Sequence, residues 1–157
     1  MLSVKIVAVG KAKEKHYRDA CEEYVKRLSR FLKLEIIELP DEKAGEELST
    51  AQKERVKEME GQRILSRLEG YVIALDINGE LRDTLRFARE MDALTQSHSK
   101  ITFVIGGSLG LSGELLSRAD MRLSFSPMTF CHPLARVMLL EQLYRAEKII
   151  NNQPYHK

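Results

Sequence analysis

Hydrophobic and polar residues follow two periods along this chain. Five short apolar or alternating stretches predict β-strands at residues 3–9, 33–39, 71–77, 101–107 and 121–126. Between them, apolar residues recur at spacings of three and four, which predicts helices with one buried face at residues 14–32, 83–97, 113–119 and 133–151. Such alternation predicts an α/β fold whose mostly parallel sheet is flanked by helices on both faces.

One stretch departs from this alternation. Residues 41–63 are more than half charged and offer little apolar surface before Ile64, Leu65 and Leu68. We therefore expect a mobile loop that leads into a surface helix. Mobile loops beside a binding face often act as lids.

The length of 157 residues suits a single domain with a core of ordinary size, covering residues 1–157. No apolar stretch approaches the ~20 residues of a membrane span, and the first residues lack a signal-peptide cleavage pattern. We expect a cytosolic protein, away from membranes. Cys21 and Cys131 form no C-x-x-C pair, so we expect reduced thiols and no metal site.

The net charge is only +2, but it is unevenly distributed. Residues 1–33 carry nine Lys or Arg against four acids, residues 34–63 carry five against nine, and residues 100–157 carry seven against four. Basic ends are compatible with an anionic partner such as RNA. Ordinary solvated helix faces would give the same pattern.

The glycine-rich turn at residues 106–110 matches G-x-S-x-G, the nucleophile elbow of hydrolases, and Asp120 and His132 follow in the order of a Ser-Asp-His triad. However, Ser112 is a good N-cap for a helix that begins near residue 113. A hydrolase elbow launches its helix directly from the nucleophile, which would here be Ser108. The hydrolase interpretation is therefore disfavoured.

Phosphate-binding loops also fit this turn poorly. It lacks the G-K-[ST] ending of a P-loop, and its glycines do not match G-x-G-x-x-G. A glycine turn without lysine suits a ligand held by backbone groups and apolar walls, such as a nucleoside. A tight connection without any ligand is the alternative.

In parallel sheets, ligands bind beyond the carboxyl ends of the strands. This rule brings together residues 75–80, 105–113 and 124–134 as candidate binding segments.

Four motifs, "VKIVAVGK", "VIGGSLG", "LSFSPMTFCH" and the "YRA" to "PYHK" ending, occur in the order and at the spacing of the RlmH family. The chain therefore resembles these ribosomal RNA methyltransferases of the SPOUT superfamily over essentially its whole length. The resemblance implies a single SPOUT domain with a C-terminal trefoil knot, its knotted cofactor-binding region covering approximately residues 71–157. It also implies S-adenosylmethionine as cofactor.

The resemblance assigns cofactor contacts residue by residue. They fall on Leu75, Gly107, Ser126, Pro127, Met128, Thr129, Phe130 and Cys131. At Cys131 the family commonly has proline, so the backbone is less constrained here.

The implied reaction is methylation of N3 of a pseudouridine in a 23S rRNA stem-loop at the ribosomal subunit interface. Its imide proton must leave, and the candidates for removing it or stabilising the anion are His132, Arg145, Tyr155 and His156. From the residues alone, His132 could be a local cap, Arg145 could form a surface ion pair with Glu141 or Glu147, and the tail could be disordered. A non-catalytic RNA-binding factor in ribosome assembly, or a small nucleotide-binding regulator, would keep the same fold.

The resemblance further implies a homodimer formed through the knotted region. The predicted helix at residues 133–151 is consistent with this, because it carries more apolar residues than one face of a small sheet should cover. They are Leu134, Val137, Met138, Leu139, Leu140, Leu143, Tyr144, Ile149 and Ile150.

Overall fold

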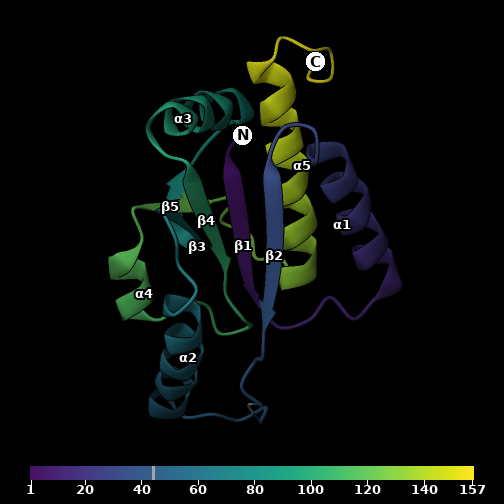
Figure 1. Cartoon of the computed structure of the whole chain (residues 1–157). Helices are drawn as coiled ribbons and strands as arrows, with labels where there is room; N and C mark the ends of the chain where they lie inside the picture. Colours follow the sequence, from purple (N-terminus) through teal and green to yellow (C-terminus); the bar gives the residue numbers. More distant parts are fainter. Residues whose placement is uncertain (44) are drawn as a thin grey trace.

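The computed structural model describes residues 1–43 and 45–157. Its centre is a five-stranded sheet in the order β2-β1-β4-β3-β5, with every neighbouring pair parallel (Figure 1). The elements in chain order are β1 (Ser3–Val9), α1 (Lys15–Leu28), β2 (Lys33–Leu39), α2 (Thr50–Leu65), β3 (Tyr71–Leu81), α3 (Thr84–Ser97), β4 (Lys100–Ile105), α4 (Gly113–Arg118), β5 (Met121–Ser124) and α5 (His132–Ile150). The predicted α/β class and parallel sheet are confirmed.

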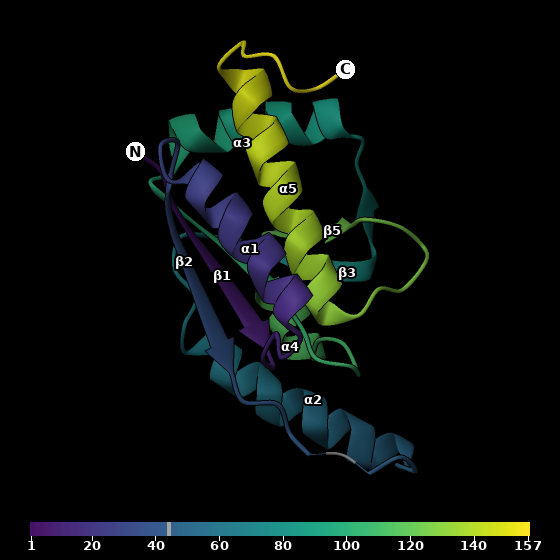
Figure 2. The ribbon, with the colours of Figure 1, turned by 90° about the vertical axis from the view of Figure 1, so that its right-hand side faces the viewer.

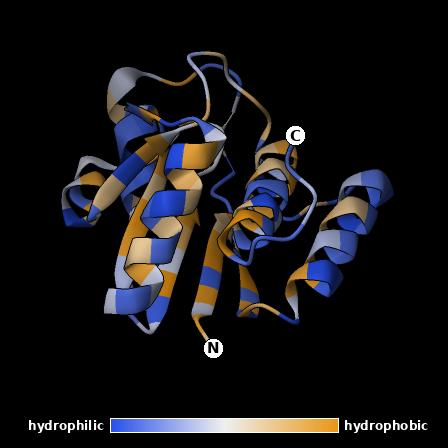
Figure 3. Cartoon of the chain, turned by 90° about the horizontal axis from the view of Figure 1, so that it is seen from above, coloured by the Kyte–Doolittle hydropathy of each residue, from blue (hydrophilic) through white to orange (hydrophobic). Residues whose placement is uncertain are grey.

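Helices cover both faces of the sheet, and alternate residues of each central strand face opposite ways. In β1, Val4, Ile6 and Ala8 join a large core with α1, α3 and α5, whereas Val7 and Val9 join a smaller core with α2 and α4. Figure 2 shows α1 and α5 side by side over the larger face. Hydrophilic and hydrophobic bands alternate on these flanking helices (Figure 3), as their sequence period predicts.

Helix α5 is the main element of the larger core. Leu139, Leu140 and Leu143 are almost completely buried within one protomer, beneath α1 and α3 and against the sheet. Of the nine apolar residues that suggested a partner, these three and Tyr144 are therefore covered by the protomer itself, whereas the other five are only partly buried. A charge at Leu139 or Leu143 would disrupt the core. The homodimer itself stays a prediction.

Helix α2 begins much earlier than the sequence pattern suggested. A mobile loop was expected to extend to residue 63, but the helix starts at Thr50. A capping box fixes this start: the Gln52 backbone N–H donates to Ser49 Oγ over 3.2 Å, and the Ser49 backbone N–H donates to the Gln52 side chain over 2.8 Å. The helix-forming Lys, Glu, Gln and Arg residues then maintain a helix with little apolar face.

Strand β3 continues beyond its predicted end at residue 77, because the chain pairs with β5 again after a bulge. Leu75 and Glu80 both pair with Leu123, so residues 76–79 project from the sheet. Gly79 is needed there, since a Cβ at this position would lie 2.7 Å from the Arg122 carbonyl oxygen.

Both chain termini lie at the end of the sheet where the strands begin (Figure 1). Within the described residues, every helix is too short or too polar to cross a membrane. The trefoil knot implied by the resemblance stays a prediction.

We expect Glu147, a buried acid, to make the stability of the fold depend on pH. Its side chain lies in α5, only 9% exposed, and burial raises its pKa to about 7, with the Asp92 charge acting in the same direction. Because the pKa is raised above that of the unfolded chain, the folded state is penalised as pH rises from about 4.3 through 7. Glu147→Gln should therefore raise the melting temperature by a few degrees at pH 8, on the order of 1–2 kcal/mol, with a smaller gain at pH 5.

The matched control is Glu22→Gln on the exposed face of α1, which should leave the melting temperature unchanged at both pH values. An equal gain for Glu147→Gln at pH 5 and pH 8 would contradict the assignment.

Candidate functional site

A cavity of about 720 Å³ opens at the carboxyl ends of β3, β4 and β5. Its walls come from the start of the β3 bulge, the glycine turn after β4, and the loop between β5 and α5. The structure thus brings together residues from the three segments, 75–80, 105–113 and 124–134, that were expected to be neighbours. The predicted residues that line it are Leu75, Gly107, Ser126, Met128, Thr129, Phe130, Cys131 and His132. Pro127 belongs to the same loop but does not line the cavity.

The loop between β5 and α5 is shaped by two serines. The Ser126 side chain accepts a hydrogen bond from the Met128 backbone N–H over 3.0 Å. The Ser124 hydroxyl lies 3.1 Å from the carbonyl oxygens of Ile77 and Ser126, linking this loop to the β3 bulge. Beyond these contacts, Met128 is 74% exposed and Phe130 40% exposed. The cavity mouth therefore presents apolar side chains without a cover in the protomer.

The glycine turn is closed by its own backbone. Gly110, with φ of +88°, donates from its N–H to the Gly107 carbonyl oxygen over 3.1 Å. The predicted N-cap is confirmed, because Ser112 Oγ accepts from the Leu115 N–H over 3.2 Å and α4 begins at Gly113. Ser108 is exposed and precedes the helix by several residues, which is not the geometry of a hydrolase elbow.

Helix α2 supports the turn from behind. Glu60 is only 4% exposed; one carboxylate oxygen accepts the Glu42 N–H over 2.9 Å. A Cβ at Gly107 would lie 3.0 Å from the other carboxylate oxygen and 3.3 Å from Val9. The missing side chain of Gly107 thus makes room for α2 as well as exposing backbone to the cavity. Burial raises the pKa of Glu60.

The residues that follow Glu60 extend this support. A Cβ at Gly61 would lie 2.5 Å from Ser112 Oγ, so only glycine allows α2 to pack this closely against the segment before α4. Gln62 donates to Glu114 over 2.8 Å, and Arg63 donates to the Pro40 carbonyl oxygen over 3.0 Å. Helix α2 therefore links the segment after β2 to the glycine turn.

His132 lies at the start of α5, where it lines the cavity. Burial lowers the pKa of its imidazole, and the Arg136 charge lowers it further. The imidazole is therefore neutral near pH 7. Its Nδ1 is buried without a hydrogen-bond partner among the described residues, and its Nε2 lies against Gly10, 2.9 Å from where a Cβ would be.

Beside His132, the buried guanidinium of Arg136 forms an ion pair with Glu38, whose side chain is 36% exposed. Arg136 Nη1 lies 2.8 Å from Glu38 Oε2, which also accepts the Ala12 N–H over 2.9 Å. Although burial acts to raise it, the pKa of Glu38 is lowered by the hydrogen bonds from Arg136 and Ala12. Arg136 Nη2 donates to the Gly10 carbonyl oxygen over 3.3 Å. The pair thus connects α5 to the segment after β1.

The other predicted catalytic residues gather elsewhere. Tyr155 packs edge-on against Tyr144 with ring centroids 4.9 Å apart, and its hydroxyl donates to Glu141 over 3.1 Å. The Arg145 guanidinium lies 4.6 Å from the Tyr155 ring centroid, pairs with Glu141, and approaches His156 Nδ1 at 3.3 Å. Burial is the main cause that raises the pKa of Tyr155 to about 12, so it stays protonated at neutral pH.

His132, which lines the cavity, begins α5, whereas the tail cluster lies near the other end of this helix. Figure 1 shows that second end of α5 beside the C-terminus. Residues 132 and 145 are separated by about 20 Å along the helix axis, at ~1.5 Å per residue. Within one protomer, the structure therefore does not bring His132 together with Arg145, Tyr155 and His156.

Comparison with known proteins identifies the family. A family model described as "Predicted SPOUT methyltransferase" matches residues 2–156. The chain belongs to the SPOUT methyltransferase family.

Curated relatives agree with this assignment, and a solved structure shares the fold. Two proteins named "Ribosomal RNA large subunit methyltransferase H", from Lactobacillus acidophilus and Alkaliphilus oremlandii, are 53% and 49% identical to this chain, each over 99% of this chain and 100% of the relative. The structure of a probable methylase family protein from Haemophilus influenzae is similar with a TM-score of 0.57, at 15% identity over 98% of this chain and 70% of that one. It supports the fold alone.

Sequence reasoning missed four supporting residues of this SPOUT methyltransferase, namely Glu38, Glu60, Gly61 and Arg136. One signal was available: Gly61 interrupts a run of strong helix formers, and such a glycine often marks close packing. The pairing of Glu38 with Arg136 joins residues far apart in sequence, and periodicity gives no indication of it.

The close packing behind the turn predicts a coupling between Gly107 and Glu60. Gly107→Ala should destabilise the fold by about 1–3 kcal/mol, because the new methyl group meets the Glu60 carboxylate. In a Glu60→Ala background the same substitution should cost much less. Urea unfolding of the wild type, both single variants and the double variant measures this coupling.

Gly113→Ala is the matched control, since the methyl group that alanine adds there meets no neighbouring side chain or backbone within 4 Å; it should be neutral or slightly stabilising. Strictly additive effects of Gly107→Ala and Glu60→Ala would show that the two residues do not press on each other.

Proposed function

We propose that this chain is an S-adenosylmethionine-dependent methyltransferase that methylates N3 of a pseudouridine in 23S rRNA. The substrate would be a stem-loop at the subunit interface, within the large subunit or the assembled ribosome, which places the protein in the cytoplasm. The observation that carries the proposal is the cavity between the glycine turn and the loop at residues 125–131. The names of the relatives support the rRNA substrate.

The cavity suits this cofactor in size and chemistry. Its volume of about 720 Å³ lies in the range of small-molecule sites, which are mostly apolar with a few placed polar groups. Leu75, Met128 and Phe130 supply apolar walls, while Gly107 and the loop backbone supply hydrogen-bonding groups. The residues proposed to hold the cofactor are Leu75, Gly107, Ser126, Pro127, Met128, Thr129, Phe130 and Cys131. When bound, it supplies a methyl group already activated by a positively charged sulfur.

The protein must then position the base and manage its imide proton. Neutral His132 lines the cavity and can accept a proton or a hydrogen bond. Protonated Tyr155 can donate a hydrogen bond, Arg145 can stabilise negative charge on the base, and His156 is a second proton acceptor. These four residues are the proposed catalytic group.

The distance along α5 implies that this group is assembled from two chains. Because Arg145, Tyr155 and His156 lie far from the cavity of their own protomer, we infer that a partner's tail completes each site in a homodimer. The uncovered Met128 and Phe130 at the mouth are consistent with this. A second cavity of about 520 Å³, lined by apolar residues including Phe125, Val137 and Met138, offers further contact surface.

The first test is methyl transfer from labelled S-adenosylmethionine to ribosomes from cells that lack the modification. We expect about one methyl group per 23S rRNA, at N3 of a pseudouridine, identified by mass spectrometry of digested rRNA. Binding of ribosomes without any transfer would instead indicate an assembly factor.

The second test addresses the two-chain site. Deleting residues 155–157 should abolish transfer, as should Gly107→Val, which disrupts the cavity wall. Mixing the two inactive variants under subunit exchange should restore about a quarter of wild-type activity, because half of the dimers then contain one intact site. Activity of the tail deletion on its own would refute a role for the tail, whereas an inactive mixture would refute sharing between chains.

A further inference from the structure

The segment between β1 and α1 borders the cavity mouth, and the proposed function has not used it. Gly10 lies directly against His132, whose ring lines the cavity. From there the chain alternates: Lys11 and Lys13 are exposed, whereas Ala12 between them is buried. Two lysines therefore project from a loop that is anchored beside the site.

This loop is held in one conformation by buried contacts. The Gly10 N–H donates to the Leu39 carbonyl oxygen over 2.8 Å, the Ala12 N–H donates to Glu38, and Arg136 donates to the Gly10 carbonyl oxygen. The ion pair of Arg136 with Glu38 joins a buried guanidinium to a carboxylate that is still 36% exposed. This pair fixes the orientation of an exposed loop, which reduces the entropy that the loop loses on binding a ligand.

The positive charges of this segment are available to a ligand. Among the residues that the structure describes, no carboxylate lies within 4.0 Å of the charged nitrogens of Lys11, Lys13 or Arg18. Arg18 donates to the Lys13 carbonyl oxygen over 3.0 Å and thereby connects α1 to the loop. By contrast, Glu42 on the segment after β2 is paired with Arg63. The unpaired cations thus gather on the side of the mouth formed by the start of α1.

Two aromatic rings follow the lysines. The rings of His16 and Tyr17 lie with their centroids 4.3 Å apart, and His16 is exposed. The Tyr17 hydroxyl lies 3.6 Å from Cys131 Sγ, and Cys131 lines the cavity. The aromatic pair is therefore beside the mouth, next to the unpaired cations.

We propose that residues 11–18 form an RNA-docking edge for the nucleotides that flank the modified base. Lys11, Lys13 and Arg18 bind backbone phosphates, and an unpaired base stacks on His16 or Tyr17. Cations beside aromatic rings are the usual combination for single-stranded RNA, whose bases are free to stack. The inference rests on the proposed function and deepens it: the substrate is presented as an unpaired loop.

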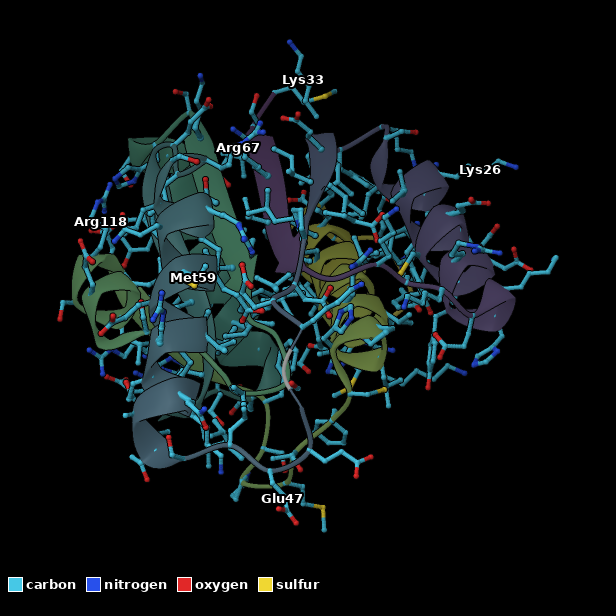
Figure 4. The ribbon with its side chains drawn as sticks, turned by 90° about the horizontal axis from the view of Figure 1, so that it is seen from below. Lys26, Lys33, Glu47, Met59, Arg67 and Arg118 are labelled. Atoms are coloured by element: carbon cyan, nitrogen blue, oxygen red, sulfur yellow. The ribbon has the colours of Figure 1, made fainter. Side chains whose placement is uncertain are left out.

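The charge is tested with the double variant Lys11→Gln/Lys13→Gln. The matched control, Lys26→Gln/Lys33→Gln, removes the same charge at the periphery of the molecule (Figure 4). We expect KM for ribosomes to rise at least tenfold with kcat within twofold of the wild type. The salt dependence of log(kcat/KM) should become shallower by about 0.7 for each phosphate that the variant no longer neutralises. The control should match the wild type.

The stacking is tested by comparing Tyr17→Ala with Tyr17→Phe. Phenylalanine keeps the ring and loses only the hydroxyl near Cys131, so it should retain wild-type KM, whereas alanine should raise KM several-fold. Equal losses in both variants would overturn stacking. For every variant, S-adenosylmethionine affinity by calorimetry and the oligomeric state by sedimentation should be unchanged.

Two outcomes would overturn the docking edge. The first is a lysine variant with the KM and salt dependence of the wild type. The second is dissociation of a dimer by that variant, which would make the surface a protein interface.

Fluorescence anisotropy with a labelled stem-loop RNA separates this inference from the proposed function. If the wild type transfers no methyl group, the proposed function fails, and equal RNA affinity of the wild type and the lysine variant would independently refute the docking edge.

Discussion

The parallel direction of all five strands is the constraint around which the molecule is arranged. It places the segments after β1, β3, β4 and β5 at one edge of the sheet, where backbone groups are no longer used by strand pairing. The cavity forms there, between the glycine turn and the loop at residues 125–131. The opposite edge holds both chain termini (Figure 1). Every residue at that second edge, the tail included, is therefore remote from the cavity of its own protomer.

Polar groups behind the cavity show how its walls are fixed. Glu60 from α2 is buried against Gly107, and Arg136, which is buried and paired with the exposed Glu38, donates to Gly10. Each arrangement desolvates charge, which contributes little to stability by itself. What each provides is a fixed position for a loop that would otherwise be free. The site is thus supported from two sides by helices, α2 behind the glycine turn and α5 behind the segment after β1.

Much of the fold could be predicted from periodicity, because the buried strands and the amphipathic helices α1 and α3 carry strong patterns. The N-cap at Ser112 was also readable, since capping is local chemistry. Helix α2 was missed because it depends on propensity and the Ser49 capping box rather than on an apolar face. The positions of the site residues relative to one another required the structure. The sequence shows that His132 and Tyr155 are candidates, but only the structure shows that they lie near opposite ends of α5 within one chain.

The cavity at the carboxyl ends of β3, β4 and β5 is the proposed binding site of S-adenosylmethionine. Hydrogen–deuterium exchange of the whole protein, with and without S-adenosylmethionine, tests this assignment at the residues concerned. We expect the cofactor to slow exchange of backbone amides at residues 106–111 and 125–131, and to leave the amides of residues 33–39 in the edge strand β2 unchanged. Unchanged exchange at both loops with a saturating concentration of cofactor, or protection confined to another part of the chain, would contradict it.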